Sequence, residues 1–135
     1  MRRLLLPAGA AEAIRTHEMS SLPEECCGLL AGEKALAGNM EVVRFVYPLT
    51  NLQHSPTAFT IDPVEHFRSW KHSVANGWDL IGAFHSHTDG PDHPSRTDLA
   101  LANEPDWAYL IVSKGLITAW EIRDRVAQPL GIEPD

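Results

Sequence analysis

The chain has 135 residues, of which 44% are apolar and 21% are charged, and its formal net charge is -7. This length predicts one domain over residues 1–135, and the balance of apolar and charged residues is typical of a folded globular protein rather than a disordered one. The negative charge argues against nucleic-acid binding, which needs a basic face, and no apolar run approaches membrane-spanning length.

The N-terminus starts with two arginines followed by three leucines, a pattern that superficially resembles a signal peptide. Pro7 interrupts the apolar run and Glu12 adds a negative charge, so the run is too short for a secretory signal. The two cysteines, Cys26 and Cys27, are adjacent in sequence, which is a poor arrangement for a structural disulfide and fits a reducing compartment. We therefore expect a cytoplasmic protein.

The first part of the chain predicts one helix and two strands. Residues 7–19 have the apolar spacing of a helix with one face toward a core. Strands are predicted at 26–32, where small apolar residues indicate burial on both sides, and at 40–48, which ends at a proline. A turn is expected between them at 33–39, and a polar loop follows at 49–56.

The middle of the chain predicts a strand followed directly by a helix. Residues 57–61 alternate as a strand does, and Asp62 and Pro63 suit the N-cap and the first position of a helix. The helix carries an apolar stripe with a lysine at its edge, formed by Val64, Phe67, Trp70, Lys71 and Val74.

The last part predicts a strand at 78–84 and a short capped helix at 94–102. A hairpin of two strands follows at 107–113 and 117–123, and a weakly ordered tail is expected from about residue 129. Helices and strands that follow one another in this order pack most naturally as a mixed sheet flanked by helices. The predicted fold class is therefore α/β, or mixed α+β.

Three histidines and three aspartates follow the strand at 78–84 within a short segment. Side chains alternate along a strand, so His85 and His87 point the same way and form a ready pair of zinc ligands. Asp98, in the first turn of the next helix, is the expected third ligand, because the intervening loop can fold back toward the strand end. Asp92 and His93 remain possible ligands on geometry alone.

A catalytic zinc also needs a nearby carboxylate to take and return a proton. Glu24 and Glu25 lie at the start of a buried strand, an unusual place for two acids unless one of them has a function, although both could simply be solvated. Ser95 has two interpretations: it is the N-cap of the helix that carries Asp98, or it stabilises a developing oxyanion. The two roles are compatible.

These residues together resemble the signature of the JAMM (MPN+) metalloproteases. That signature is a glutamate, a distant His-Ser/Thr-His motif, then seven residues, a serine, two residues and an aspartate. Glu25, the motif at 85–87, Ser95 and Asp98 have this spacing. The resemblance extends over roughly residues 4–123 and is greatest to the small bacterial members of the family.

The resemblance implies an MPN fold, which is similar to that of the cytidine deaminases and has a curved, mostly antiparallel mixed sheet packed between helices. It implies one zinc ion per chain, held by His85, His87 and Asp98. It further implies that Glu25 is the general base and that Ser95 stabilises the tetrahedral intermediate.

Members of this family cleave peptide or isopeptide bonds after the C-terminal diglycine of ubiquitin-like proteins, and the small bacterial ones resemble processing peptidases for sulfur carriers, some of which release newly made cysteine. The resemblance therefore implies a zinc metallopeptidase with a carrier tail as substrate. One alternative is a non-catalytic scaffold, but such proteins are expected to have lost ligands. The other is a zinc deaminase, whose His-x-Glu and Pro-Cys-x-x-Cys motifs are absent.

Two features of the substrate site follow from the resemblance. An extended diglycine tail is expected to bind as an added strand beside the strand at 78–84, with only glycine narrow enough for the channel. The family usually has proline after the second histidine, where this chain has Thr88. Thr88 therefore leaves the conformation of the active-site loop open.

Overall fold

The computed structural model describes residues 2–34 and 39–134, which form seven strands and three helices. The strands are β1 (Arg3–Leu6), β2 (Cys27–Glu33), β3 (Met40–Leu49), β4 (Asp79–Ser86), β5 (Ala108–Ser113), β6 (Leu116–Arg123) and β7 (Val126–Pro134), and the helices are α1 (Ala8–Ser21), α2 (Pro63–Ala75) and α3 (Arg96–Leu101). Part of the turn predicted at 33–39 lies outside the described residues.

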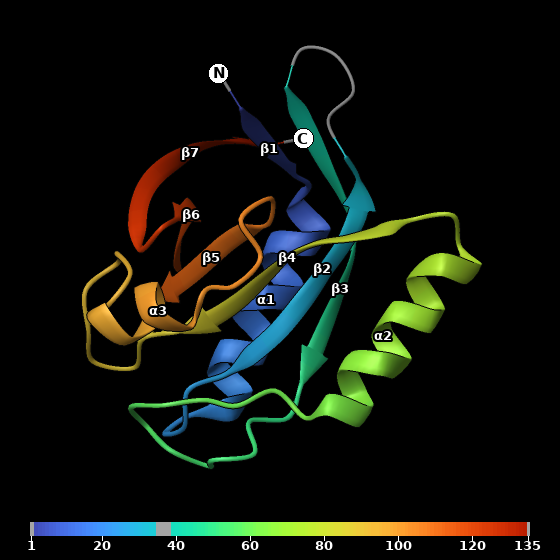
Figure 1. The fold of residues 1–135 in the computed structure, drawn as a ribbon. Helices are drawn as coiled ribbons and strands as arrows, with labels where there is room; N and C mark the ends of the chain where they lie inside the picture. The colour runs from blue at the N-terminus through green and yellow to red at the C-terminus, as the bar shows by residue number, and fades with distance from the viewer. Residues whose placement is uncertain (1, 35–38, 135) are drawn as a thin grey trace.

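The strands form one strongly curved mixed sheet that closes into a barrel (Figure 1). Their order is β1-β3-β2-β4-β5-β6-β7, and β7 pairs back to β1. β1 runs parallel to β3 and β7, and β4 runs parallel to β5, whereas the other four pairings are antiparallel. This arrangement agrees with the predicted mixed class and places β4, which carries the histidines, between β2 and β5.

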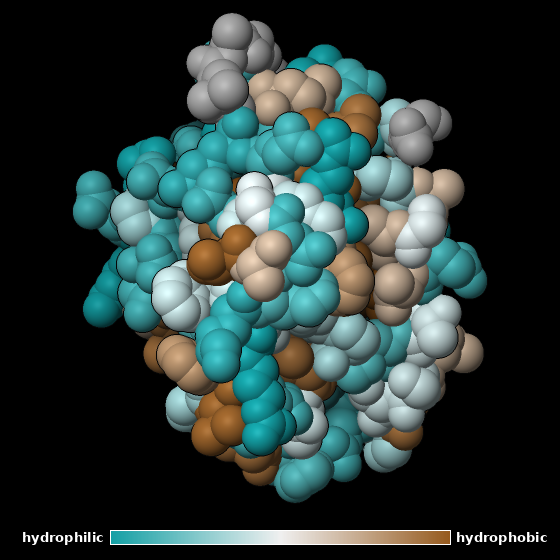
Figure 2. Space-filling view, turned by 90° about the vertical axis from the view of Figure 1, so that its right-hand side faces the viewer, coloured by the Kyte–Doolittle hydropathy of each residue, from teal (hydrophilic) through white to brown (hydrophobic). Residues whose placement is uncertain are grey.

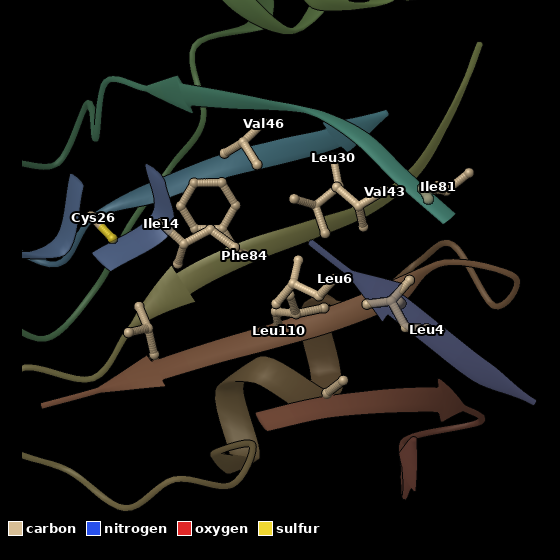
Figure 3. Close-up of a cluster of buried hydrophobic side chains, with 13 residues drawn as sticks. Leu4, Leu6, Ile14, Cys26, Leu30, Val43, Val46, Ile81, Phe84 and Leu110 are labelled. Atoms are coloured by element: carbon tan, nitrogen blue, oxygen red, sulfur yellow. The ribbon is translucent and has the colours of Figure 1, made fainter. Parts of the chain in front are cut away.

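The main core lies between the curved sheet and α1. Ile14 of α1 and Phe84 of β4 are both fully buried there, together with leucines and valines from four strands (Figure 3). A second cluster lies on the outer face of β2 and β4, under α2, and includes Leu29, Ala31 and Tyr47. Because β2 has a core on each side, its apolar residues do not alternate with polar ones, as the sequence predicted.

The predicted helices and the final hairpin are present with small shifts of their ends. Asp62 caps α2, since the Val64 amide donates to its carboxylate at 2.8 Å, and Pro63 is the first helical residue. The turn between β5 and β6 is at Lys114 and Gly115, both with positive φ. Along the described part of the chain, no helix has the length and hydropathy needed to cross a membrane.

The strand predicted at 57–61 is wrong. Only an isolated bridge between Asn51 and Ile61 forms there. The Asn51 side chain accepts from the Thr60 amide at 3.1 Å and donates to the Ala58 carbonyl at 2.9 Å. These backbone groups bond to a side chain instead of a neighbouring strand, so the segment is an ordered loop.

The weakly ordered tail predicted from about residue 129 is also wrong. Residues Val126–Pro134 form β7, which pairs antiparallel with β6 and parallel with β1. Pro129 is tolerated opposite Trp120, and Leu130 and Ile132 pack against the main core. Partners far apart in sequence give this tail its order, and a local pattern does not reveal them.

Candidate metal centre and its pocket

The end of β4 and the start of α3 bring the three predicted ligands together. His85 is the penultimate residue of β4, His87 follows the strand, and Asp98 is in the first turn of α3. Nε2 of His85 lies 3.1 Å from Nε2 of His87, and Oδ2 of Asp98 lies 3.2 and 3.0 Å from these two atoms. They are the one group of three possible metal ligands that the described residues contain.

The separations within this group fit a tetrahedral zinc site. Zinc–ligand bonds of about 2.1 Å at tetrahedral angles place neighbouring ligand atoms about 3.4 Å apart, close to the 3.0–3.2 Å observed. Nδ1 of His87 lies 2.7 Å from the Pro91 carbonyl, which accepts its proton. A neutral His87 then has its lone pair on Nε2, the atom that faces Asp98, and this is the tautomer that can bind a metal ion.

Two further contacts hold the ligands in place. The ring of Phe59 stacks on that of His85, with centroids 4.6 Å apart and planes at 23°. Ser95 and Asp98 form a reciprocal capping box: the Ser95 amide donates to Oδ2 of Asp98 at 2.8 Å, and the Asp98 amide donates to Oγ of Ser95 at 3.1 Å. Ser95 is therefore the N-cap, and its hydroxyl proton stays free to donate.

The electrostatics of the group depend on these contacts. Burial alone would raise the pKa of Asp98, but hydrogen bonds from His85 and His87 outweigh that effect and hold this pKa well below its usual range. The hydrogen bond to Asp98 raises the pKa of His87, although burial opposes it. A carboxylate that stays ionised beside two imidazoles favours binding of a cation.

Glu25 lies just before β2 and lines the same pocket as His87, Ser95 and Asp98. The residue is 7% exposed, and burial raises the pKa of its carboxyl to about 7, with a smaller opposing effect of His87. The position of Glu25 is fixed by the neighbouring Cys26, whose amide donates to Oγ of Ser86 at 2.8 Å.

The other candidate residues lie apart from this group. Glu24 is partly exposed, and one of its carboxylate oxygens lies 3.2 Å from Nδ1 of His54. Asp92 and His93 are exposed and face each other at 3.9 Å. Of the two acids before β2, only Glu25 is buried at the pocket. Neither Asp92 nor His93 joins the group formed by His85, His87 and Asp98, hereafter the metal group.

The pocket has a volume of about 470 Å³ and lies between two loops. One wall is the segment 56–59, and the other is the segment 88–91. The Thr88 hydroxyl joins them by donating to the Pro56 carbonyl at 2.8 Å. The residue that departs from the family pattern thus fixes the loop through a hydrogen bond.

The expectation that a substrate tail adds as a strand beside β4 is wrong. β4 pairs with β2 along one edge and with β5 along the other, up to His85 and Ser86. β4 therefore has no free edge to which a further strand could add.

Sequence reasoning missed the contributions of Asn51 and Phe59. Asn51 is buried and its amide also donates to the Glu25 carbonyl at 3.1 Å, while Phe59 covers His85. A buried asparagine in a loop has no local signature. The alternation around Phe59 indicated a strand rather than a ring stacked on a ligand.

Two relatives are similar to this chain over most of its length. The 36%-identical CysO-cysteine peptidase of Mycobacterium tuberculosis aligns over 82% of this chain and 73% of its own length. The 34%-identical desampylase of Haloferax volcanii aligns over 88% of this chain and 87% of its own.

Solved structures share the fold. The solution structure of a protein from Desulfitobacterium hafniense matches with a TM-score of 0.88 and 34% identity, covering 98% of this chain and 92% of that one. A JAB1/MPN domain protein of Archaeoglobus fulgidus matches with a TM-score of 0.59 at 20% identity, covering 96% and 97%, and supports the fold alone. The model of the prokaryotic homologues of the JAB domain matches residues 7–123, and the chain belongs to this family.

Proposed function

We propose that the chain is a zinc metallopeptidase that hydrolyses the peptide or isopeptide bond after the C-terminal diglycine of a ubiquitin-like or sulfur-carrier protein. The observation that carries this proposal is the meeting of three metal-ligand atoms with the buried carboxyl of Glu25 in one pocket. A pKa near 7 lets Glu25 accept and return a proton at neutral pH, as a general base must.

His85, His87 and Asp98 would hold one zinc ion, which supplies Lewis-acid activation of a water molecule. Glu25 takes the proton of the attacking water and returns it to the leaving amine. The Ser95 hydroxyl accepts a hydrogen bond from the Asp98 amide through one lone pair. Its O–H is therefore free to donate to the oxyanion that develops on the substrate carbonyl. The loops at 56–59 and 88–91 limit the width of the pocket beside the scissile bond.

The names of the relatives support a carrier protein as the substrate. One is a CysO-cysteine peptidase, two are desampylases, and another, from Thermus thermophilus, is a probable TtuB-protein conjugate cleaving protease. A non-catalytic scaffold of the same fold is less consistent with the site, since a complete ligand group and a buried carboxyl persist in this chain.

The test uses a ubiquitin-fold sulfur carrier extended by one cysteine after its C-terminal diglycine, hereafter the carrier substrate. We expect mass spectrometry to show release of cysteine by the zinc-loaded protein. Glu25→Gln should keep its zinc and lose roughly 10²- to 10⁴-fold in rate, whereas the matched variant Glu24→Gln stays active. Equal loss in both variants, or no cleavage by the unmodified protein of either this substrate or a lysine-linked carrier, would overturn the proposal.

A further inference from the structure

α2 turns its apolar stripe away from the barrel. Its buried residues are the small polar Ser69 and Ser73, whereas Val64, Phe67 and Val74 are 55%, 57% and 54% exposed. Apolar stripes ordinarily face the core of a globular protein. The outward stripe therefore needs another explanation.

The inner face of α2 is already satisfied without these residues. The His72 ring lies 2.8 Å from the Tyr47 hydroxyl through Nδ1, and the His66 ring lies near that of Trp107, with centroids 6.2 Å apart. The Ser69 hydroxyl donates to a backbone carbonyl within the helix. Polar and small side chains thus attach α2 to the sheet, and the apolar ones are left facing solvent.

The outward side chains form an organised surface. Phe67 stacks on Trp70 with centroids 5.9 Å apart, and Nζ of Lys71 lies 5.8 Å from the centre of the Phe67 ring. Figure 2 looks onto this side of the molecule and shows brown and tan residues among the teal ones. With Val64 and Val74, this surface exposes roughly 400 Å² of side chain, the size at which patches on monomers are often functional.

The charges on this surface favour an acidic partner. Arg68 and Lys71 lie beside the stripe and form no ion pair with the described residues, although the whole chain has a net charge of -7. The one acid of α2, Glu65, is already engaged within the chain, since its carboxylate accepts from the amide and the hydroxyl of Thr50 at 2.8 and 2.9 Å. A twofold pairing of two such helices would bring like charges together, which is unfavourable.

The stripe starts at the same end of the barrel as the metal group. Thr50 bonds to Glu65 in the first turn of α2 and follows Leu49, the last residue of β3. Leu49 pairs with Cys27 of β2, and Cys27 pairs with His85 of β4. Two strand spacings amount to about 10 Å. An extended tail gains about 3.3 Å per residue, so a few residues beyond the pocket reach α2.

We propose that this surface docks the folded body of the carrier whose C-terminal tail occupies the pocket. The matching face of the carrier is apolar and flanked by carboxylates, and the docking face of this chain consists of Val64, Phe67, Arg68, Trp70, Lys71 and Val74. This inference rests on the proposed function, because it concerns the same substrate. Docking away from the reacting bond would select a folded carrier over other proteins that end in diglycine.

The experiment compares two substrates: the carrier substrate and a synthetic peptide of its C-terminal residues with the same added cysteine. Phe67→Glu and Lys71→Glu should each lower kcat/KM for the carrier substrate about tenfold or more, mainly through KM, and leave the peptide unchanged. Val126→Glu is the matched control, since Val126 is an equally exposed valine on β7. Thermal unfolding of each variant confirms that its fold is intact.

An equal effect on both substrates, or none on the carrier substrate, overturns the docking proposal. So does a change from dimer to monomer in sedimentation that accompanies the loss, because a second copy then occupies the stripe. A third outcome is that Phe67→Glu binds neutral lipid vesicles more weakly than the unmodified protein does but cleaves the carrier substrate equally well. This result would identify a membrane surface as the partner and overturn the docking proposal. If the unmodified protein cleaves neither substrate, the proposed function fails, and docking is then tested by titration with the carrier that ends in diglycine. A Kd for this carrier that is the same for Phe67→Glu and the unmodified protein overturns the docking proposal.

Discussion

Glu25 is the residue at which catalysis and stability oppose each other. Burial raises the pKa of its carboxyl from an ordinary value of 4.5 to about 7 in the folded protein. Below pH 4.5 the group is neutral in the folded and unfolded chain alike and costs nothing. As the pH rises from 4.5 to about 7, the carboxyl ionises more readily in the unfolded chain than in the folded one, so the free energy of unfolding falls. This loss reaches its full size above pH 7.

Glu25→Gln removes this penalty and should stabilise the metal-free protein above pH 7. The gain is about 1–2 kcal/mol in the free energy of unfolding, less than the full pKa shift implies, since solvent in the pocket screens the charge. Denaturant unfolding in a chelator at pH 8 measures it. The advantage should vanish near pH 4, and Glu24→Gln, which changes a partly exposed carboxyl, should show none of it.

Thr88 connects the two walls of the pocket through its bond to the Pro56 carbonyl. Thr88→Val keeps the shape of the side chain and removes the donor, so we expect kcat/KM to fall about fivefold with unfolding free energy changed by about 1 kcal/mol or less. Thr88→Ser should retain most of the activity. Metal content, measured by elemental analysis, should stay the same in both, and its loss in Thr88→Val would contradict this role.

The sequence predicted which three side chains meet in the candidate metal group but not the residues that hold them there. The His-x-His spacing on a strand and an aspartate at a helix start are local patterns, and the structure brings one nitrogen or oxygen atom of each of these side chains within 3.2 Å of the other two. The stacking of Phe59 on His85 depends on a loop that arrives from elsewhere in the chain. The bond of Thr88 to the other wall has the same origin, so neither contact could be read from spacing.

At the scale of elements, the loop between β3 and α2 is organised by one buried side chain. The amide of Asn51 donates to the carbonyls of Glu25 and Ala58, and its oxygen accepts from the amides of Gln53 and Thr60. The alternation in this segment would suit a strand, but these bonds satisfy its backbone without one. The pattern predicted the wrong element because a side chain replaced the neighbouring strand.

Asn51→Ala should lower the free energy of unfolding by about 2–4 kcal/mol, since it leaves buried backbone groups unpaired. It should also lower activity more than stability alone explains, because the loop carries Phe59 and supports Glu25. Asn103→Ala changes an exposed asparagine and should be close to neutral. Thermal unfolding and the cleavage assay check both variants; a neutral Asn51→Ala would show that the loop holds its shape in another way.

At the scale of the whole molecule, closure of the barrel depends on the two ends of the chain. β1 and β7 pair in parallel, and the apolar residues Leu4 and Leu6 of β1 are buried in the core. The sequence predicted the class and most elements, because their periodicities are local. It did not predict closure, because the pairing of the first and last strands is decided by contacts more than a hundred residues apart.

Metal binding should stabilise this whole structure, because the three ligands join β4 to α3 across the loop between them. An ion that binds only the folded chain adds about 4 kcal/mol at a thousandfold excess over its Kd, which corresponds to an unfolding temperature higher by about 10 °C or more. Chelation should therefore lower the unfolding temperature and abolish cleavage, and added zinc should restore both. His87→Ala should contain far less than one zinc per chain and lose this response to zinc. His93→Ala, which changes an exposed histidine of the same loop, should keep it. A His87→Ala protein that still gained stability from zinc would show that the ion binds elsewhere.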